Sequence, residues 1–531
     1  MRPPWTTPIL RAKTLTGAGE LLRQALRRDR IVAPTSISLF VLMAYASAFA
    51  TESLYHSTAA QLKAVALING QLGILALYGP IETNAGVGAL AMSKMTVLYA
   101  LFAAGVFVML VRRHTRAEEE SGRAELLAGT SVGRNAPLFA AIIESAGLAV
   151  ALGLLCGLAA VVGGLPMEGS IYFGLSWIGT GLVATGIAAV CCQLSTSART
   201  CAVAAAGALG GLFLIRAVGD ATSLHWLDWF SPLGWNVQLH AWSQPRTWVV
   251  GLYLVLAAAL LAGAQWLRAH RDLNGGLFAP RAGAADGSPW LRGPQSLELK
   301  VHRTMLAGWS VAVLASCAFF GAITPALNGV LKSIGGERLT RDLGGSLMVA
   351  ILSEFAVIVS CFAVIVVAHV SADELDGRAE LVFAAAQSRT RWFAACAGIA
   401  VGGTAWLMLL AGLGMCTGYG LANGADPIQG LTGALVWIPA ILIVCGLCLA
   451  TMAVRPSWTP AAWGWPLGLW VLSVVPPLFK APVWIAGLSP YDHVPKIPTQ
   501  PMDWSSEALL ALLAAVIVVA ASQRFRVRDI G

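Results

Sequence analysis

Long apolar runs constrain this chain more than any other feature of its sequence. About twelve of them follow one another, and most reach the roughly 18 residues that a helix needs to cross a bilayer. Of the 531 residues, 57% are hydrophobic and only 12% are charged, a balance that no soluble core requires. The sequence therefore predicts an all-α integral membrane protein. The expected spans are residues 31–51, 93–111, 137–162, 171–194, 201–218, 248–267, 305–326, 347–369, 392–417, 431–454, 460–480 and 507–523.

The distribution of Lys and Arg predicts the orientation of these spans. With both termini in the cytoplasm, about 26 of the 35 Lys and Arg residues fall on the cytoplasmic side, as the positive-inside rule requires. The run 62–78 is ambiguous, because it is short and contains Asn69 and Gln71. As a further span it would place the arginines around 112–134 outside, so we expect an external or interfacial helix there.

A charged segment, here called the box, occurs twice. Residues 118–127 read EEESGRAELL and residues 373–382 read DELDGRAELV, 255 residues apart and without a gap. The same register carries Arg134 onto Arg389. One interpretation is a solvated juxtamembrane helix, but solubility does not require Gly, Arg, Ala, Glu and Leu to stay in register, whereas docking on a partner does. The repetition favours two copies of one membrane unit, each presenting the same element.

The repeat extends beyond the box. The further matches are Cys192 and Arg199 with Cys448 and Arg455, and Ser231-Pro232 with Ser489-Pro490. We therefore predict two parallel six-span halves, residues 1–267 and 296–531, joined by a cytoplasmic linker at 268–295. Amphipathic segments at 20–28 and 297–303 precede the first span of each half, and such segments lie in the lipid headgroup plane.

These features together resemble the fused permease of ABC-type exporters, and more narrowly the actinobacterial group of polyketide-antibiotic and multidrug exporters. The resemblance rests on six spans per half, an acidic Gly-Arg-Ala-Glu-Leu box between the second and third spans, and a Ser-Pro motif before each sixth span. It covers nearly the whole chain. It implies a multi-pass protein of the bacterial plasma membrane that exports drugs, antibiotics or other hydrophobic or amphiphilic compounds by alternating access.

The resemblance also implies a division of labour with another chain. The sequence contains no Gly-x-x-x-x-Gly-Lys-Ser/Thr phosphate loop. We therefore expect ATP and Mg²⁺ on two copies of a separate ABC ATP-binding subunit, and neither a cofactor nor enzymatic activity in this chain. Membrane lipid and a small-molecule substrate are the other expected partners, and nucleic acid is not one.

In that family, a coupling helix between the second and third spans docks on the ATPase. By resemblance this role falls on Glu118, Glu119, Gly122, Arg123, Glu125 and Arg134 in the first half, and on Asp373, Glu374, Asp376, Gly377, Arg378, Glu380 and Arg389 in the second. The first half has Ser121 where the second has Asp376, so the two docks need not be equivalent. Arg199 and Arg455, in short second loops, are candidates for a smaller contact; the alternative is a tight turn with one topogenic arginine.

Within the box, helical register points Arg123 and Glu125 in different directions, so that one faces a partner while the other anchors the element to its own bundle. Gly122 and Gly377 mark either a helix break or a close approach of two backbones.

Candidates for the substrate pathway are Glu144 and Glu354, which fall inside predicted spans. A carboxylate stranded in lipid costs at least ~2.5 kcal/mol on insertion scales, so such residues are functional candidates by default. Glu144 lies about two turns from the cytoplasmic end, so reaching water by tilting is its alternative role. The ten cysteines lie in or beside apolar runs without paired spacing in a polar loop, which predicts neither disulfides nor a metal site.

Two other classes of protein remain open at this point. A proton-coupled secondary multidrug transporter also has twelve spans in two parallel halves, but is expected to carry buried carboxylates along its path. A membrane-embedded transferase or protease needs acids, histidines or nucleophiles clustered at one depth, and the acidic residues of the predicted external loops are scattered.

Overall fold

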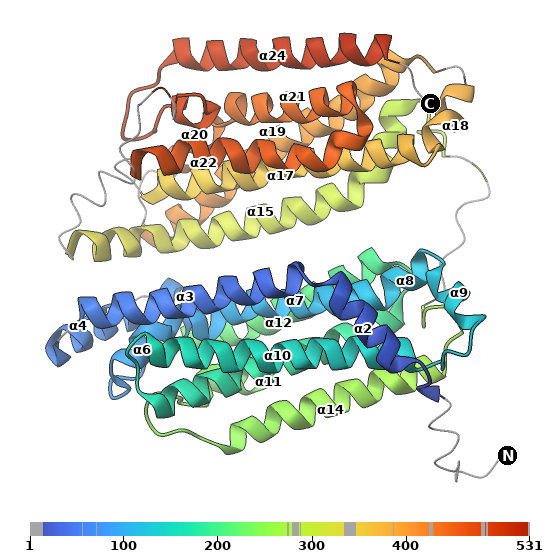
Figure 1. The fold of residues 1–531 in the computed structure, drawn as a ribbon. Coiled ribbons are helices and arrows are strands. Elements are labelled where there is room, and N and C mark those ends of the chain that lie inside the picture. Colours follow the sequence, from blue (N-terminus) through green and yellow to red (C-terminus); the bar gives the residue numbers. More distant parts are fainter. Residues whose placement is uncertain are drawn as a thin grey trace. The chain divides into compact units, whose positions relative to one another are not determined.

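The computed structural model describes residues 14–528, except 56, 71, 223, 273–274, 279–285, 287, 334–346, 386, 424–427, 479–483 and 485–486. Within these ranges every regular element is a helix, and eleven helical segments are long and apolar enough to cross a membrane. The predicted all-α membrane fold is therefore confirmed. The chain divides into two compact units, residues 1–283 and 284–531 (Figure 1).

The first unit contains six of the candidate spans. Its α-helices are α2 (Ala18–Arg28), α3 (Val32–Leu54), α4 (Thr58–Asn69), α5 (Leu72–Tyr78), α6 (Gly86–Lys94), α7 (Ala100–His114), α8 (Arg116–Glu120), α9 (Arg123–Ala128), α10 (Ala136–Val162), α11 (Met167–Leu194), α12 (Ala198–Ala221), α13 (Pro232–Gln238) and α14 (Trp248–Ala269). A π-helical turn, η1 (Met95–Tyr99), joins α6 to α7, and a 3₁₀ helix, η2 (His225–Phe230), precedes α13.

The second unit contains the other five candidate spans. Its α-helices are α15 (Pro294–Ser333), α17 (Leu347–Leu375), α18 (Arg378–Ala384), α19 (Arg389–Asn423), α20 (Ile428–Leu435), α21 (Ile438–Val454), α22 (Gly464–Leu478) and α24 (Trp504–Val527). Two 3₁₀ helices, η3 (Pro456–Trp463) and η4 (Pro490–His493), lie before α22 and before α24.

Small residues let neighbouring helices pack backbone to backbone in both units. A Cβ atom placed on Gly153 of α10 would lie 2.5 Å from the carbonyl oxygen of Gly174 in α11, and one on Gly418 of α19 would overlap the carbonyl of Ala318 in α15. Such contacts are the usual source of helix association in lipid, where burial of apolar surface gives little driving force. The most buried spans, α11 and the α20–α21 segment, occupy the same place in the repeat.

Two expected elements differ in the structure. The run 62–78 forms two short helices, α4 and α5, rather than one, and the Asn69 side chain satisfies both backbone groups of Ile81 at 2.6 and 2.9 Å. The expected span 460–480 begins as the 3₁₀ helix η3 and continues as α22, because Pro456 and Pro460 interrupt the α-helical hydrogen bonds. Its described part is too short to count among the eleven spans, and residues 479–480 lie outside the described ranges.

Candidate functional site at the repeated box

The box folds in the same way in both units. In the first, α8 and α9 are separated by Gly122 with φ 75°; in the second, α17 and α18 are separated by Gly377 with φ 74°. This left-handed backbone is accessible to glycine without the steric cost that a Cβ brings. Open space surrounds the position of a Cβ on either glycine, so backbone conformation and not close packing requires the residue. Of the two predicted alternatives, a helix break and a close approach of two backbones, the structure shows the helix break.

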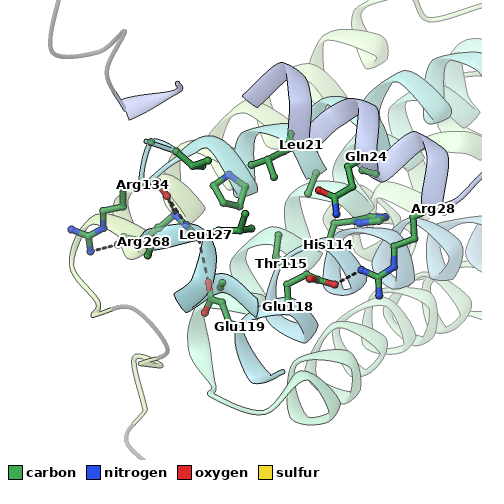
Figure 2. A pocket seen from close by; sticks show the side chains of 18 of the residues that line it. Leu21, Gln24, Arg28, His114, Thr115, Glu118, Glu119, Leu127, Arg134 and Arg268 are labelled. Carbon is green, nitrogen blue, oxygen red and sulfur yellow. Dashed lines mark hydrogen bonds and ion pairs between the residues drawn. The ribbon is translucent and has the colours of Figure 1, made fainter. Parts of the chain in front are cut away.

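A buried carboxylate fixes the first box to its own bundle. Glu119 accepts hydrogen bonds from Arg116 at 2.7 Å and from Arg271 at 2.7 and 2.9 Å, and it pairs with Arg268 at 3.4 Å. Figure 2 shows Glu119 turned toward Arg268 at the end of α14. All four side chains are buried, so the box is tied to the last helix of the unit.

The second box is fixed by the equivalent residue. Glu374, which the 255-residue register places on Glu119, receives two hydrogen bonds from Arg528, at 2.5 and 2.7 Å. Arg528 follows α24, the last helix of the second unit, and its guanidinium stacks over Phe525 with 5.0 Å to the ring centroid. Both bonds come from Nη2 of Arg528, which lies between the two carboxylate oxygens in a charge-assisted contact.

A second repeated arginine completes each attachment. Arg134 donates to the carbonyl oxygen of Arg271 at 2.6 Å, and Arg389 donates to the carbonyl oxygen of Arg528 at 2.7 Å. We call Glu119, Arg134 and Arg271 the first clamp, and the matching residues Glu374, Arg389 and Arg528 the second clamp. Each clamp joins the beginning and the end of the box loop to the C-terminal end of the last helix of its unit.

Most of the other charged side chains of the box are exposed, although Glu118 and Asp373 are partly buried. Arg123 pairs with Glu118 at 3.5 Å, and Arg378 pairs with Asp373 at 2.7 Å and Asp376 at 2.8 Å. The hydrogen bond from Arg378 to Asp373 raises the pKa of the guanidinium. Glu125 and Glu380 are exposed as well. The buried anchor is thus Glu119 in one unit and Glu374 in the other, rather than a residue of the Arg-Ala-Glu segment.

One pair of box residues was missed by the sequence reasoning. Leu126 and Leu381, at equivalent positions, are 77% and 75% exposed, although leucine usually occupies the interior of a helix bundle. The signal was present, because both copies of the box carry leucine here. From the sequence alone, Leu126 and Leu381 were not distinguished from leucines of the helix-bundle core.

The second loops contact the box region. In the first unit, Glu120 accepts a hydrogen bond at 2.8 Å from the backbone N–H of Ala198, beside the exposed Arg199. In the second unit, Ser371 and Thr459 share a hydrogen bond at 2.6 Å, close to the exposed Arg455. Each second loop therefore lies beside the box of its own unit.

A cavity of about 470 Å³ lies between α2 and the first box (Figure 2). Leu21 and Gln24 of α2 line one side, and Thr115 and Leu127 line another. An ion pair between Arg28 and Glu118 crosses its edge. The amphipathic segment predicted before the first span is therefore a helix that contacts the box directly.

The two predicted pathway carboxylates have different environments. Glu144 in α10 is buried, and its Oε2 lies 3.4 Å from Nε2 of His114. Glu354 in α17 accepts a hydrogen bond from the indole of Trp470 in α22 at 3.2 Å. A role of either residue in transport stays a prediction.

Comparison with known proteins decides the family. The family model described as "Multidrug efflux system permease Rv1217c, C-terminal domain" matches residues 291–526. The chain is 34% identical over 536 residues to the multidrug efflux system permease protein Rv1217c of Mycobacterium tuberculosis, and the match covers 98% of this chain and 96% of that protein. The chain belongs to this family of efflux permeases.

Membership in this family confirms the resemblance to the mycobacterial multidrug efflux permeases. It makes the chain a multi-pass permease of the cell membrane, and thus a transport protein. The second box, Glu374 and Arg389 of the second clamp and α24 nearly to its end lie within the matched C-terminal domain, which ends two residues before Arg528, and the first box and clamp lie within the full-length match.

Proposed function

We propose that this chain is the membrane-spanning subunit of an ATP-driven ABC exporter of drugs, antibiotics or other hydrophobic compounds. ATP and Mg²⁺ bind two copies of a separate ATP-binding subunit, one at each box on the cytoplasmic side. The name of the mycobacterial relative supports the cargo class. The repetition of the box supports two docking points, one in each unit.

The exposed leucine pair carries this proposal. Leu126 and Leu381 stand on short helices at equivalent positions, flanked in each case by an exposed Arg and Glu. A large apolar side chain surrounded by charges is the typical pattern of a helix that inserts into a groove of a partner. A loop that only kept the chain soluble would not place leucine at the same exposed position twice.

The clamps explain how a push on the box moves the bundle. Glu119 and Arg134 attach the first box to the end of α14, and Glu374 and Arg389 attach the second to the end of α24. These hydrogen bonds are charge-assisted and buried or partly buried, so they keep each box attached to its helix end when the box is displaced. A flexible loop would not transmit that displacement to the helix. Closure of the ATPase pair then rotates helices of each unit, the movement that alternating access requires.

The experiment is copurification of the full-length permease with the ATP-binding protein encoded beside it, followed by ATPase assays. We expect the wild type to retain the ATPase, and the double variant Leu126→Asp/Leu381→Asp to lose it, because a charge cannot enter an apolar groove. Leu277→Asp is the matched control, since Leu277 is 53% exposed and bonds to the backbone of Gln193 near the first box but outside it.

The proposal fails if the double variant retains the ATPase with unchanged activity. It also fails if no ATPase copurifies and the purified permease moves substrate into liposomes in response to a proton gradient alone. The second result would favour a proton-coupled secondary transporter.

A further inference from the structure

Two buried carboxylates and one partly buried imidazole, all with metal-binding groups, converge in the first unit, beside the clamp but separate from it. Asp29 follows α2, His114 ends α7, and Glu144 lies in α10. One ligand atom of each lies within 4.8 Å of the other two, and this is the one such group found among the described residues. The side chains of Asp29 and Glu144 are 1% exposed and that of His114 is 9% exposed.

Hydrogen bonding within the protein does not satisfy this cluster. The Nε2 atom of His114 lies 2.7 Å from Asp29 Oδ2 and 3.4 Å from Glu144 Oε2. The Nε2 atom carries at most one proton. The shorter of the two distances indicates that His114 donates this proton to Asp29 and not to Glu144. Neither oxygen of Glu144 has a hydrogen-bond partner. A buried ionised carboxylate without a partner costs several kcal/mol, on the order of the penalty for an unpaired buried ion, so a bound cation would stabilise this cluster.

The geometry fits a tetrahedral metal site. With metal–ligand bonds of about 2.1 Å, the ligand atoms of such a site lie about 3.4 Å apart. The Nε2–Oε2 distance of 3.4 Å already has this value, and the Nε2–Oδ2 distance of 2.7 Å would have to widen by several tenths of an ångström. Arg113 pairs with the other oxygen of Asp29 at 2.7 Å and orients that carboxylate, as second partners of metal ligands usually do.

We propose that Asp29, His114 and Glu144 bind one divalent transition-metal ion of the zinc class. An imidazole nitrogen with two carboxylates selects such ions over Mg²⁺ and Ca²⁺, which prefer oxygen ligands alone. His114 also lines the cavity of Figure 2, so water can reach a fourth ligand position. The ion joins α2 to α7 and α10, and thereby fixes the helix that lies against the first box.

The test measures metal in the purified full-length permease, and it does not depend on transport or on an ATPase. The protein is stripped with a chelator, loaded with Zn²⁺ and desalted, and bound zinc is measured by mass spectrometry. We expect one equivalent per chain and a higher unfolding temperature with zinc than without. Glu144→Gln and His114→Gln should each lose at least nine-tenths of the metal, whereas Glu144→His, which keeps a ligand, should retain it.

Two controls separate this site from other sources of metal. Glu354→Gln removes a span carboxylate that bonds to Trp470, and should leave one equivalent bound. Loading with Co²⁺ should give a visible spectrum without the charge-transfer band of thiolate ligands, which excludes the ten cysteines. The proposal is overturned if the wild type retains no more metal than Glu144→Gln, or if the cobalt spectrum shows thiolate ligation.

Discussion

Glu119 is the residue on which the first clamp depends, and its replacement by glutamine gives the sharpest test of the clamp. The substitution keeps the size of the side chain and removes its charge. Arg116, Arg268 and Arg271 are 1%, 6% and 8% exposed, so three guanidinium groups lose their shared counterion without gaining access to water. Removing one partner of a buried ion pair destabilises by about 3–5 kcal/mol.

This free-energy cost destabilises the attached state of the box relative to a locally opened one, because the clamp holds one loop to the end of one helix. Since 1.4 kcal/mol is a factor of ten in an equilibrium constant, a loss of about 3–5 kcal/mol raises the opening equilibrium roughly 10²- to 10³-fold or more. Hydrogen exchange measured by mass spectrometry on peptides covering 116–128 reports this directly. We expect faster exchange there, and little change in α3.

Glu374→Gln is the internal comparison, since Glu374 holds only Arg528 and not three arginines. We expect a smaller effect on the second box, on the order of the 1.5–3 kcal/mol of a charged hydrogen bond. Glu20→Gln removes the acidic partner of a surface ion pair, a side chain that is 79% exposed. This variant should change hydrogen exchange of peptides 116–128 by less than tenfold. Unchanged exchange of 116–128 in Glu119→Gln would show that the clamp does not hold the box.

Three further predictions follow from other parts of the structure. Gly122→Val or Gly377→Val should destabilise the box helix by about 1–2 kcal/mol, measured by hydrogen exchange. Asparagine at the same position should be tolerated better than valine. Equal effects of valine and asparagine would contradict the left-handed backbone of these glycines. Hydrogen bonds from two serines lower the pKa of Asp503, the N-cap of α24, from 3.8 to about 2, so its stabilisation is complete above pH 3.8 and is lost as the pH falls toward 2. Asp503→Asn should therefore remove stability at pH 5 and none near pH 2, which thermal unfolding at several pH values checks. Asn236→Leu should lower the unfolding temperature through a loss of about 1–3 kcal/mol, because Asn236 donates to the carbonyl of Thr96 in the π-helical turn at 2.8 Å; an unchanged temperature would refute this.

Local pattern was sufficient for the fold class and for the shape of the box. Apolar length predicted eleven of the twelve spans, and a helix break was one of the two alternatives predicted for Gly122 and Gly377, which adopt a left-handed backbone. Helical periodicity did not predict which charges turn inward. Glu119 and Glu374 meet arginines 152 and 154 residues further along the chain, and no local feature distinguishes them from their exposed neighbours.

Long-range convergence also explains what the sequence missed elsewhere. Asp29, His114 and Glu144 come from three helices, so the spacing typical of a metal motif is absent, and Glu144 was interpreted by its depth in the membrane alone. The two prolines of η3 were visible in the sequence, but the apolar composition around Pro460 outweighed them in the prediction of a regular span.

The most direct test of the central claim is photo-cross-linking from the two exposed leucines of the boxes. A photoreactive amino acid is placed at Leu126, at Leu381 or, as a control, at Leu277, and the permease is irradiated in membranes that contain its ATP-binding partner. We predict an adduct with the ATP-binding subunit from both box positions and none from the control. Absence of that adduct from both boxes, in membranes where the permease still transports, would contradict it.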